Sequence, residues 1–591
     1  MLPGPLFRVE LVAAARQRRY YLLRVLYAAI ILFTLWVSYQ SMSMGRYGAD
    51  EGASISQMAE TAKAFFSAFS WIQLIGILAV GPAMAVGTIA TERERRTIEY
   101  LFTTDLSNLE IVLGKTFARL LVVGKFVLVS LPILFLFRML GGIPADMLAA
   151  SFLISASTAL FLTSMSVCVS VWAVRSRDAA MRVYLILFAL IVLPPIVTTM
   201  AMVLGFGSGM VAELLAPAMN FLRDLNPLWV LGTAMSGVYS GGAPLNFGPV
   251  YYMVGYHVVL SIALVALATA AVRRVHLRES SAGAPKKKAD GATLRRRWLP
   301  RWRPGIGDNA MLWKEAFAPT SRAKLGIVAG AANVLVVVAA MGLILYLFIQ
   351  SLWNEGVHRD IYFEFSSTFT GVIGTGLLLM LAARASGLVT MEKERDSWVS
   401  LLATPLTGGE IMRGKMLGNL FAARWGFFLL LFSAALGIVL DIRYLPVVAA
   451  QSLAFAVCAW FVTNLGLFFS LRSTTSLRAM GMTLGVGSFV GGAYLFCCCP
   501  LMALGGGPGG GGDEFMLGLA PCMPFLIAAP SVVYVQTREI YSVDIPGEII
   551  AALVVGLVGY AIASALFMSY FAHQADQAAG RTTESPGAHE A

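Results

Sequence analysis

Long apolar runs alternate with short polar connections along all 591 residues of the chain. A helix needs about 20 apolar residues to cross a bilayer. Backbone groups in lipid must be hydrogen-bonded within their own segment, so each run is predicted to be helical. The pattern predicts twelve membrane spans, near residues 20–38, 65–90, 119–137, 148–174, 180–204, 249–272, 325–350, 366–390, 416–440, 446–471, 479–504 and 549–572.

Composition and charge support an all-α polytopic membrane protein in a lipid bilayer. Hydrophobic residues make up 58% of the chain and charged residues only 13%, whereas soluble domains carry about 25% charged residues. The net charge of +11 could indicate a nucleic-acid partner, but the distribution of the 44 Lys and Arg residues favours membrane topology instead. With the N-terminus inside, only seven lie outside: Arg46, Lys63, Arg138, Arg223, Arg359, Arg443 and Arg538. We therefore predict a plasma (inner) membrane protein with both termini cytoplasmic and no nucleic-acid partner.

The chain contains an internal repeat. Residues 91–120 and 391–420 align without gaps at an offset of 300, and eleven of thirty positions are identical, against about two expected by chance for average composition. Because each half has six predicted spans, both copies face the same side, which predicts a parallel 6+6 repeat. The predicted organisation is a first six-span half at 1–272, a basic cytoplasmic linker at 273–308, a second six-span half at 309–573 and a disordered cytoplasmic tail at 574–591.

Sequence patterns within the repeated segments predict their local structure. Residues 92–102 and 392–402 each predict a short amphipathic helix, and the patterns Ser107-x-x-Glu110 and Thr407-x-x-Glu410 predict capping boxes that start the following helices. The apolar stripes are Ile98, Leu101 and Phe102 in one copy and Trp398, Leu401 and Leu402 in the other. We call residues 92–110 the first elbow and residues 392–410 the second elbow. An interfacial hairpin that only connects two helices is the alternative interpretation.

At these residues the sequence resembles the type-2 ATP-binding-cassette (ABC) permease family. The second elbow carries the family pattern most fully, in Glu392-Lys-Glu-Arg, Ala403-Thr-Pro-Leu and Gly414-Lys415, whereas the first has Asp105 where the second has Pro405. Asn226–Trp229 and Ala520–Pro524 resemble the short re-entrant outer helices of that family.

The resemblance implies two permease units fused in one chain, which form the membrane part of an exporter. It also implies that both elbows dock on separate cytoplasmic ABC ATPase subunits, two copies in all, and that ATP acts through this partner with no cofactor bound by the chain itself. By this resemblance the ATPase-coupling residues are Glu92, Glu94, Arg95, Glu110, Glu392, Glu394, Arg395 and Glu410.

No ATP-binding, metal or catalytic motif is found in the sequence. Gly114-Lys115-Thr116 matches the end of a phosphate-binding loop, but Leu109 stands where that loop requires glycine. The chain is therefore predicted not to be an enzyme, and its cysteines show no zinc-site spacing. The substrate is left unassigned.

Two other functions stay open. An ion-coupled secondary transporter needs ionisable groups inside its spans. The predicted spans contain no interior Asp or Glu, His257 is their only histidine, and Arg384 and Arg424 lie near cytoplasmic ends, as do Lys125 and Arg182. A non-transporting membrane anchor of an ATPase-driven envelope machine is the second alternative.

Overall fold

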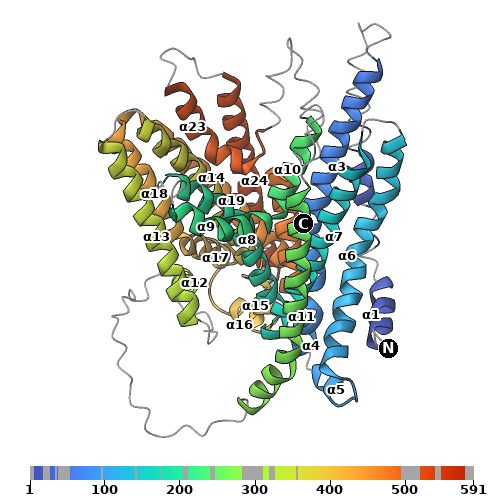
Figure 1. Cartoon of the computed structure of the whole chain (residues 1–591). Coiled ribbons are helices and arrows are strands. Elements are labelled where there is room, and N and C mark those ends of the chain that lie inside the picture. The colour runs from blue at the N-terminus through green and yellow to red at the C-terminus, as the bar shows by residue number, and fades with distance from the viewer. Residues whose placement is uncertain are drawn as a thin grey trace. The chain divides into compact units, whose positions relative to one another are not determined.

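A computed structural model describes most of the chain, and every element in the described part is a helix (Figure 1). The described residues are 5–16, 21, 25, 27–33, 36, 54–94, 97–139, 143–173, 175–203, 210–239, 247–282, 310–317, 326–353, 357–493, 519–538 and 547–578. Most of the predicted span at 20–38 and most of the predicted linker therefore lie outside the described residues. The start of the predicted tail is helical as far as Ala578, and its remainder also lies outside them.

The chain divides into two compact units, one comprising Met1–Arg295 with Leu495–Gly510 and the other Arg296–Tyr494 with Gly511–Ala591. The described helices of the first unit are α1 (Pro5–Ala15), α3 (Ser54–Ala85), α4 (Gly87–Glu94), α5 (Ile98–Phe102), α6 (Asn108–Met139), α7 (Ala145–Trp172), α8 (Ser176–Val203), α9 (Met210–Asp224), α10 (Pro227–Tyr239) and α11 (Gly248–Ala282). Those of the second are α12 (Ala310–Phe317), α13 (Gly326–Trp353), α14 (Val357–Ala385), α15 (Thr390–Lys393), α16 (Trp398–Leu402), α17 (Gly408–Ala422), α18 (Arg424–Leu440), η2 (Ile442–Tyr444), α19 (Leu445–Arg472), α20 (Ser476–Ser488), η3 (Phe489–Ala493), α23 (Met523–Arg538) and α24 (Gly547–Ala578).

Six described helices are long and apolar enough to cross a membrane, and a bent pair raises the number to seven. They confirm a multi-pass membrane protein and coincide with the predicted spans at 65–90, 148–174, 249–272, 366–390, 446–471 and 549–572. Helices α6, α8 and α13 cover three further predicted runs. The twelve-span count stays a prediction.

One predicted span is not a single straight helix. The run at 416–440 is divided between α17 and α18, which meet at Ala423 with a bend of 50°. No proline lies at the bend, and the N–H of Ala423 bonds to the carbonyl of Leu420, a tight i→i−3 pattern that ends α17. The prediction of one continuous helix is therefore wrong here.

Each unit is built around one central helix. In the first unit α7 contacts α3, α6, α8 and α11, and in the second α19 contacts α14, α20, α23 and α24. Helix α7 is rich in small hydroxyl side chains that bond to their own backbone: Thr158, Thr163 and Ser166 each donate to the carbonyl four residues earlier, at 2.7 Å. Small residues of this kind let neighbouring helices approach closely in a membrane.

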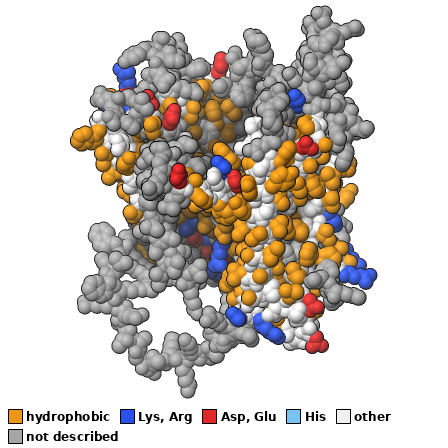
Figure 2. All heavy atoms as spheres, in the orientation of Figure 1, with side chains coloured by type: hydrophobic (Ala, Val, Ile, Leu, Met, Phe, Trp, Pro, Cys, Tyr) orange, Lys and Arg blue, Asp and Glu red, His pale blue; other side chains and the backbone are white. Residues whose placement is uncertain are grey.

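The surface of the first unit fits a lipid environment. Figure 2 shows hydrophobic side chains over the middle of its helices, on the right of the view, with charged side chains toward their lower ends. On α11, Tyr251, Val259 and Ile262 are among the large apolar side chains that face outward.

Short helices form where Asn226–Trp229 and Ala520–Pro524 predict them, as α10 and α23, and their re-entrant position on the outer side stays a prediction. Asn226 caps α10, since its side-chain oxygen accepts the N–H of Leu228 at 3.0 Å and its amide donates to the Ile191 carbonyl at 3.0 Å. His257 is fully buried next to this turn, 3.3 Å from the Leu225 carbonyl and 3.4 Å from the Ser157 hydroxyl. These contacts give His257 a structural role.

The tight packing of α19 on α14 can be tested at Gly466. A Cβ atom at this position would lie 2.4 Å from the Cβ of Ala385 and 3.1 Å from its carbonyl carbon. We expect Gly466→Ala to destabilise the protein by about 1–3 kcal/mol, the usual cost of overpacking, and to lower the melting temperature measured in detergent. Gly485→Ala on α20 is the control, because no atom lies within 4 Å of its added Cβ. Equal melting temperatures for the two variants would contradict the close contact.

Candidate functional site

Both elbows are divided into two short helices. The predictions of one continuous helix over 92–102 and another over 392–402 are wrong, because α4 ends before α5 begins and α15 ends before α16 begins. The amphipathic part is confined to α5 and α16. Each elbow therefore contains a break ahead of its second helix.

The breaks have the same cause in both copies. The carbonyl of Glu92 accepts a hydrogen bond from the N–H of Thr97 at 2.8 Å, and the carbonyl of Glu392 accepts one from Ser397 at 2.9 Å. A hydrogen bond from an N–H to the carbonyl five residues earlier is typical of the Schellman motif, which ends a helix. In the second copy Asp396 takes the left-handed conformation that the motif requires, with φ at 56°. Asp tolerates this region better than most residues other than glycine.

A buried lysine ties the first elbow to two other helices. The side chain of Lys115 on α6 is 1% exposed, and its Nζ lies 2.9 Å from Glu10 on α1 and 2.5 Å from Glu92 on α4. Arg119 contacts the other oxygen of Glu10 at 3.3 Å. Burying an ammonium group is costly unless it is paired and hydrogen-bonded, so these carboxylates compensate its charge and fasten α1 and the elbow to α6.

The electrostatics of Glu10 follow from this network. Burial raises the pKa of the Glu10 carboxyl, but the charges of Lys115 and Arg119 outweigh that effect and hold the pKa below its ordinary value. The carboxylate is therefore ionised at neutral pH. Its stabilising effect is present above the ordinary carboxyl pKa and is lost as the pH falls through the lowered pKa of the folded state.

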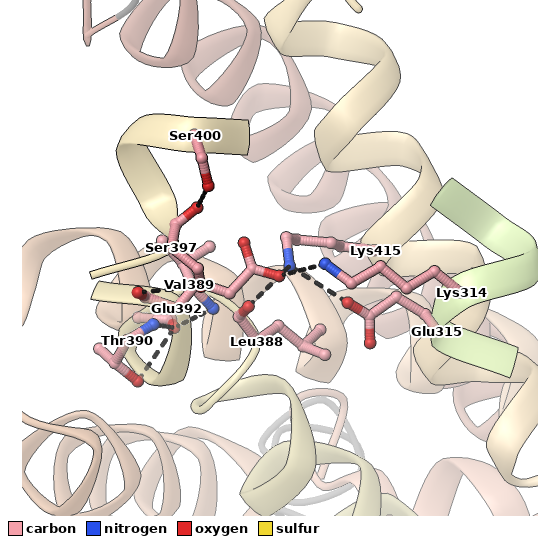
Figure 3. A network of polar contacts seen from close by, with 10 residues as sticks. Lys314, Glu315, Leu388, Val389, Thr390, Glu392, Ser397, Ser400 and Lys415 are labelled. Carbon is pink, nitrogen blue, oxygen red and sulfur yellow. Dashed lines mark hydrogen bonds and ion pairs between the residues drawn. The ribbon is translucent and has the colours of Figure 1, made fainter. Parts of the chain in front are cut away.

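The second unit repeats the arrangement, with Lys314 in place of Arg119 as the second cation (Figure 3). Lys415 on α17 has a side chain that is 0% exposed, and its Nζ lies 2.9 Å from Glu392 and 3.1 Å from Glu315 on α12. The Leu388 carbonyl accepts a third bond from Nζ at 2.8 Å. Lys314, also on α12, approaches the same oxygen of Glu392 at 2.9 Å. The ammonium group thus has three acceptors from two segments of the chain, α12 and residues 388–392.

Arg93 and Glu94 of the first elbow form hydrogen bonds with the connection between α7 and α8. The carboxylate of Glu94 accepts from the N–H and hydroxyl of Ser176, at 3.4 and 3.1 Å, at the start of α8. Arg93 donates to the carbonyls of Val171 and Ala173 at the end of α7. A carboxylate at a helix N-terminus and a cation at a C-terminus both complement the helix dipoles.

The second elbow contacts the α19–α20 connection in the same way. Glu394 accepts from the N–H and hydroxyl of Ser476 at 2.6 and 3.2 Å, and Lys393 donates to the Leu471 carbonyl. Ser176 and Ser476 are 300 residues apart, as are Glu94 and Glu394. The 300-residue repeat therefore includes both the elbows and the helix starts that they contact, at Ser176 and Ser476.

A further repeated contact attaches each elbow to its central helix. The Ser170 hydroxyl on α7 accepts the N–H groups of residues 89 and 90 at 3.2 and 2.8 Å. The Ser470 hydroxyl on α19 accepts those of residues 389 and 390, both at 3.0 Å. The same side chain thus fixes the backbone just before each elbow.

The predicted apolar stripes also pack inward. Ile98 is 3% exposed and belongs to a cluster with Val112 and Val171, against which Phe102 is packed. Trp398 lies against the corresponding cluster, which includes Met412 and Leu467. These contacts fix α5 and α16 on the helices of their own units.

The opposite faces of α5 and α16 are exposed. Tyr100 on α5 is 74% exposed and Val399 on α16 is 75% exposed. In the loops that follow, Asp105 in the first elbow and Pro405 in the second are exposed as well. We call these two surfaces the elbow tips.

The eight predicted coupling residues therefore occupy different environments. Glu92, Glu94, Glu392 and Glu394 all make contacts within the chain. Glu110 and Glu410 complete the predicted capping boxes, which are confirmed, with Ser107 N–H at 2.9 Å from Glu110 and Thr407 N–H at 2.9 Å from Glu410. Arg395 is exposed, and Arg95 lies outside the described residues. Contact of these residues with a partner stays a prediction.

The sequence analysis missed the partners of the elbow carboxylates. Lys115 appears in the sequence only at the end of the rejected phosphate-loop match and Lys415 only within the family pattern, and neither Glu10 nor Glu315 is predicted to pair with them. The serines on α7 and α19 and those at the starts of α8 and α20 were also missed. Extending the comparison at an offset of 300 to residues 161–176 and 461–476 reveals identical residues at 161, 163, 170 and 176, and this was the available signal.

Residues 5–278 match the family model described as ABC-2 family transporter protein. The comparison with curated proteins finds no match. The matched range contains the first elbow and every first-unit contact described above.

Removing one partner from the buried network should strongly destabilise the protein. We expect Lys415→Met to lower the free energy of unfolding by about 3–5 kcal/mol, because two carboxylates lose their shared cation in a buried site. Arg413→Met is the control, since Arg413 lies on the same helix and is exposed. Chemical or thermal unfolding in detergent measures both. If Lys415→Met unfolds like the control, the pairing is unimportant for stability.

Proposed function

We propose that the chain, whose residues 5–278 match the model of the ABC-2 family of transporter proteins, is a multi-pass membrane component of the ABC class and contains two fused permease units of an exporter. The observation that carries this proposal is the repeated network. Lys115 with Glu92 and Glu10 in one unit corresponds to Lys415 with Glu392 and Glu315 in the other. The second unit lies beyond the matched range, so these shared contacts are its link to the family.

Membership of this family implies an ABC ATPase as partner. We propose that two cytoplasmic copies act on this chain, one at each elbow, and that they bind the ATP while the chain itself binds no cofactor. Twelve spans in a parallel 6+6 arrangement, with both termini cytoplasmic in the plasma membrane, would place both elbows on the side where ATP is available. The strong excess of Lys and Arg on that side supports this orientation.

The elbow tips are the proposed contact surface. They expose Tyr100 and Val399 while the opposite faces of α5 and α16 are packed on their own units. Exposed aromatic and aliphatic side chains on a protein surface are typical anchors for a partner. Arg95 and Arg395 flank these tips in sequence, and we retain them as proposed polar contacts.

The elbow carboxylates then act as positioning residues. Force applied to a tip passes through Glu92 and Glu392 to the buried lysines on α6 and α17. It passes through Glu94 and Glu394 to the starts of α8 and α20. Each elbow therefore pulls on two membrane helices at once. Closing the partner ATPases on ATP would rock the helices of both units between inward- and outward-facing states.

We expect a charge placed on a tip to abolish partner binding and leave the fold intact. Val399→Glu should remove the ATPase that copurifies with the detergent-solubilised chain, because burying an unpaired carboxylate in an interface is costly. Tyr100→Glu makes the same test at the first elbow. The measurement is the stoichiometry of ATPase per chain after affinity purification from the native host. Melting temperatures should equal that of the wild type.

Arg443→Glu serves as the matched control, because Arg443 is exposed on η2 at the far end of α18 from the elbow. A stoichiometric ATPase that survives both tip variants would contradict the tips as the contact surface. Absence of any copurifying ATPase with wild-type chain would favour a stand-alone carrier. Substrate-stimulated ATPase activity of the complex would distinguish an exporter from a non-transporting anchor.

A further inference from the structure

An exposed arginine lies at the bend between α17 and α18. Its guanidinium carbon is 4.4 Å from the centre of the Phe421 ring and 5.8 Å from that of Trp425, so Arg424 is bracketed by two aromatic side chains. One terminal nitrogen donates to the Phe421 carbonyl at 3.1 Å. The side chain therefore points back toward α17, the end that the charge distribution predicts to be cytoplasmic.

The surface around this arginine is apolar and faces outward. Exposed side chains recur about once per helical turn from α17 into α18, at Leu417, Phe421, Trp425, Phe428 and Leu431. An apolar stripe of this kind on a membrane helix faces lipid. Arg and Trp together are typical of the level where lipid headgroups begin.

A second arginine lies on α14, which packs against both α17 and α18. Arg384 donates to the backbone carbonyl of Glu315 at 3.5 Å. The Glu315 carboxylate attracts its charge, and the charge of Arg424 repels it to a smaller extent. Guanidinium groups are well matched to phosphate, which can accept hydrogen bonds from both. A phosphate between the two arginines would offset their mutual repulsion.

The first unit has neither cation. Met84 and Gly124 stand 300 residues before Arg384 and Arg424, and α6 continues without a break through the position that corresponds to the bend. The repeated fold therefore forms without these arginines. Their presence in the second unit calls for a separate explanation.

We propose that Arg384 and Arg424 bind the phosphate of an anionic phospholipid whose acyl chains lie along Trp425, Phe428 and Leu431. With the orientation predicted from charge, this lipid belongs to the cytoplasmic leaflet, where anionic headgroups attract arginine. The site requires only that the chain is embedded in a membrane. It does not depend on the ATPase partner.

The test is native mass spectrometry of the purified chain with phosphatidylglycerol and phosphatidylcholine at equal concentrations. We expect the wild type to retain phosphatidylglycerol preferentially. We expect Arg424→Gln to weaken that retention about fivefold, the effect of one basic residue at an anionic surface. Arg384→Gln should act similarly. Arg413→Gln, an exposed arginine nearer the start of α17, should leave retention unchanged.

Because Arg424 is exposed, its substitution should not unfold the protein, and a melting curve of the variant checks this. Unchanged retention of phosphatidylglycerol by Arg424→Gln would overturn the proposal. Equal retention of phosphatidylcholine by the wild type would do the same. Displacement of the lipid by millimolar inorganic phosphate would show a free-anion site and would also overturn the assignment to a lipid.

Discussion

Each unit of this protein is organised around the burial of one lysine. An ammonium group in an apolar interior needs several acceptors, and at least one of them must carry a negative charge. Around Lys115 and Lys415 these acceptors come from a helix near the start of the unit and from the elbow. The helix near the start of the unit, the elbow and the helix that carries the lysine must therefore meet at the lysine Nζ. The position of each elbow follows from this requirement.

A glycine helps to make this meeting possible in the second unit. A Cβ on Gly414 would lie 2.8 Å from the Cβ of Met311 on α12, whereas one on Gly114 would make an ordinary contact, 3.5 Å from the backbone nitrogen of Phe7 on α1. Helix α12 can thus lie directly on α17, with Glu315 within reach of Lys415. The repeat retains the glycine, the lysine and the acidic partner as one structural set.

Local signals in the sequence predicted local structure well. The capping boxes at Glu110 and Glu410 depend only on residues three positions apart, and both form. The helix breaks were not predicted, because a Schellman turn usually carries glycine and here Asp396 takes that position. The bend at Ala423 likewise lacks the proline that usually marks one. Ion pairs between distant segments leave no pattern among neighbouring residues. That Glu92 and Glu392 point inward, toward the buried lysines, is therefore seen only in the structure.

The bend between α17 and α18 also has a consequence for membrane thickness. As a span, α18 offers 17 residues, a length of about 26 Å at 1.5 Å per residue. The hydrocarbon core of a typical bilayer is about 30 Å thick. A bilayer matches a helix this short by thinning or by snorkelling of the flanking side chains, whereas α6 with its 32 residues imposes no such demand. Matching to the thickness of the bilayer is therefore a stricter requirement at α18 than at α6.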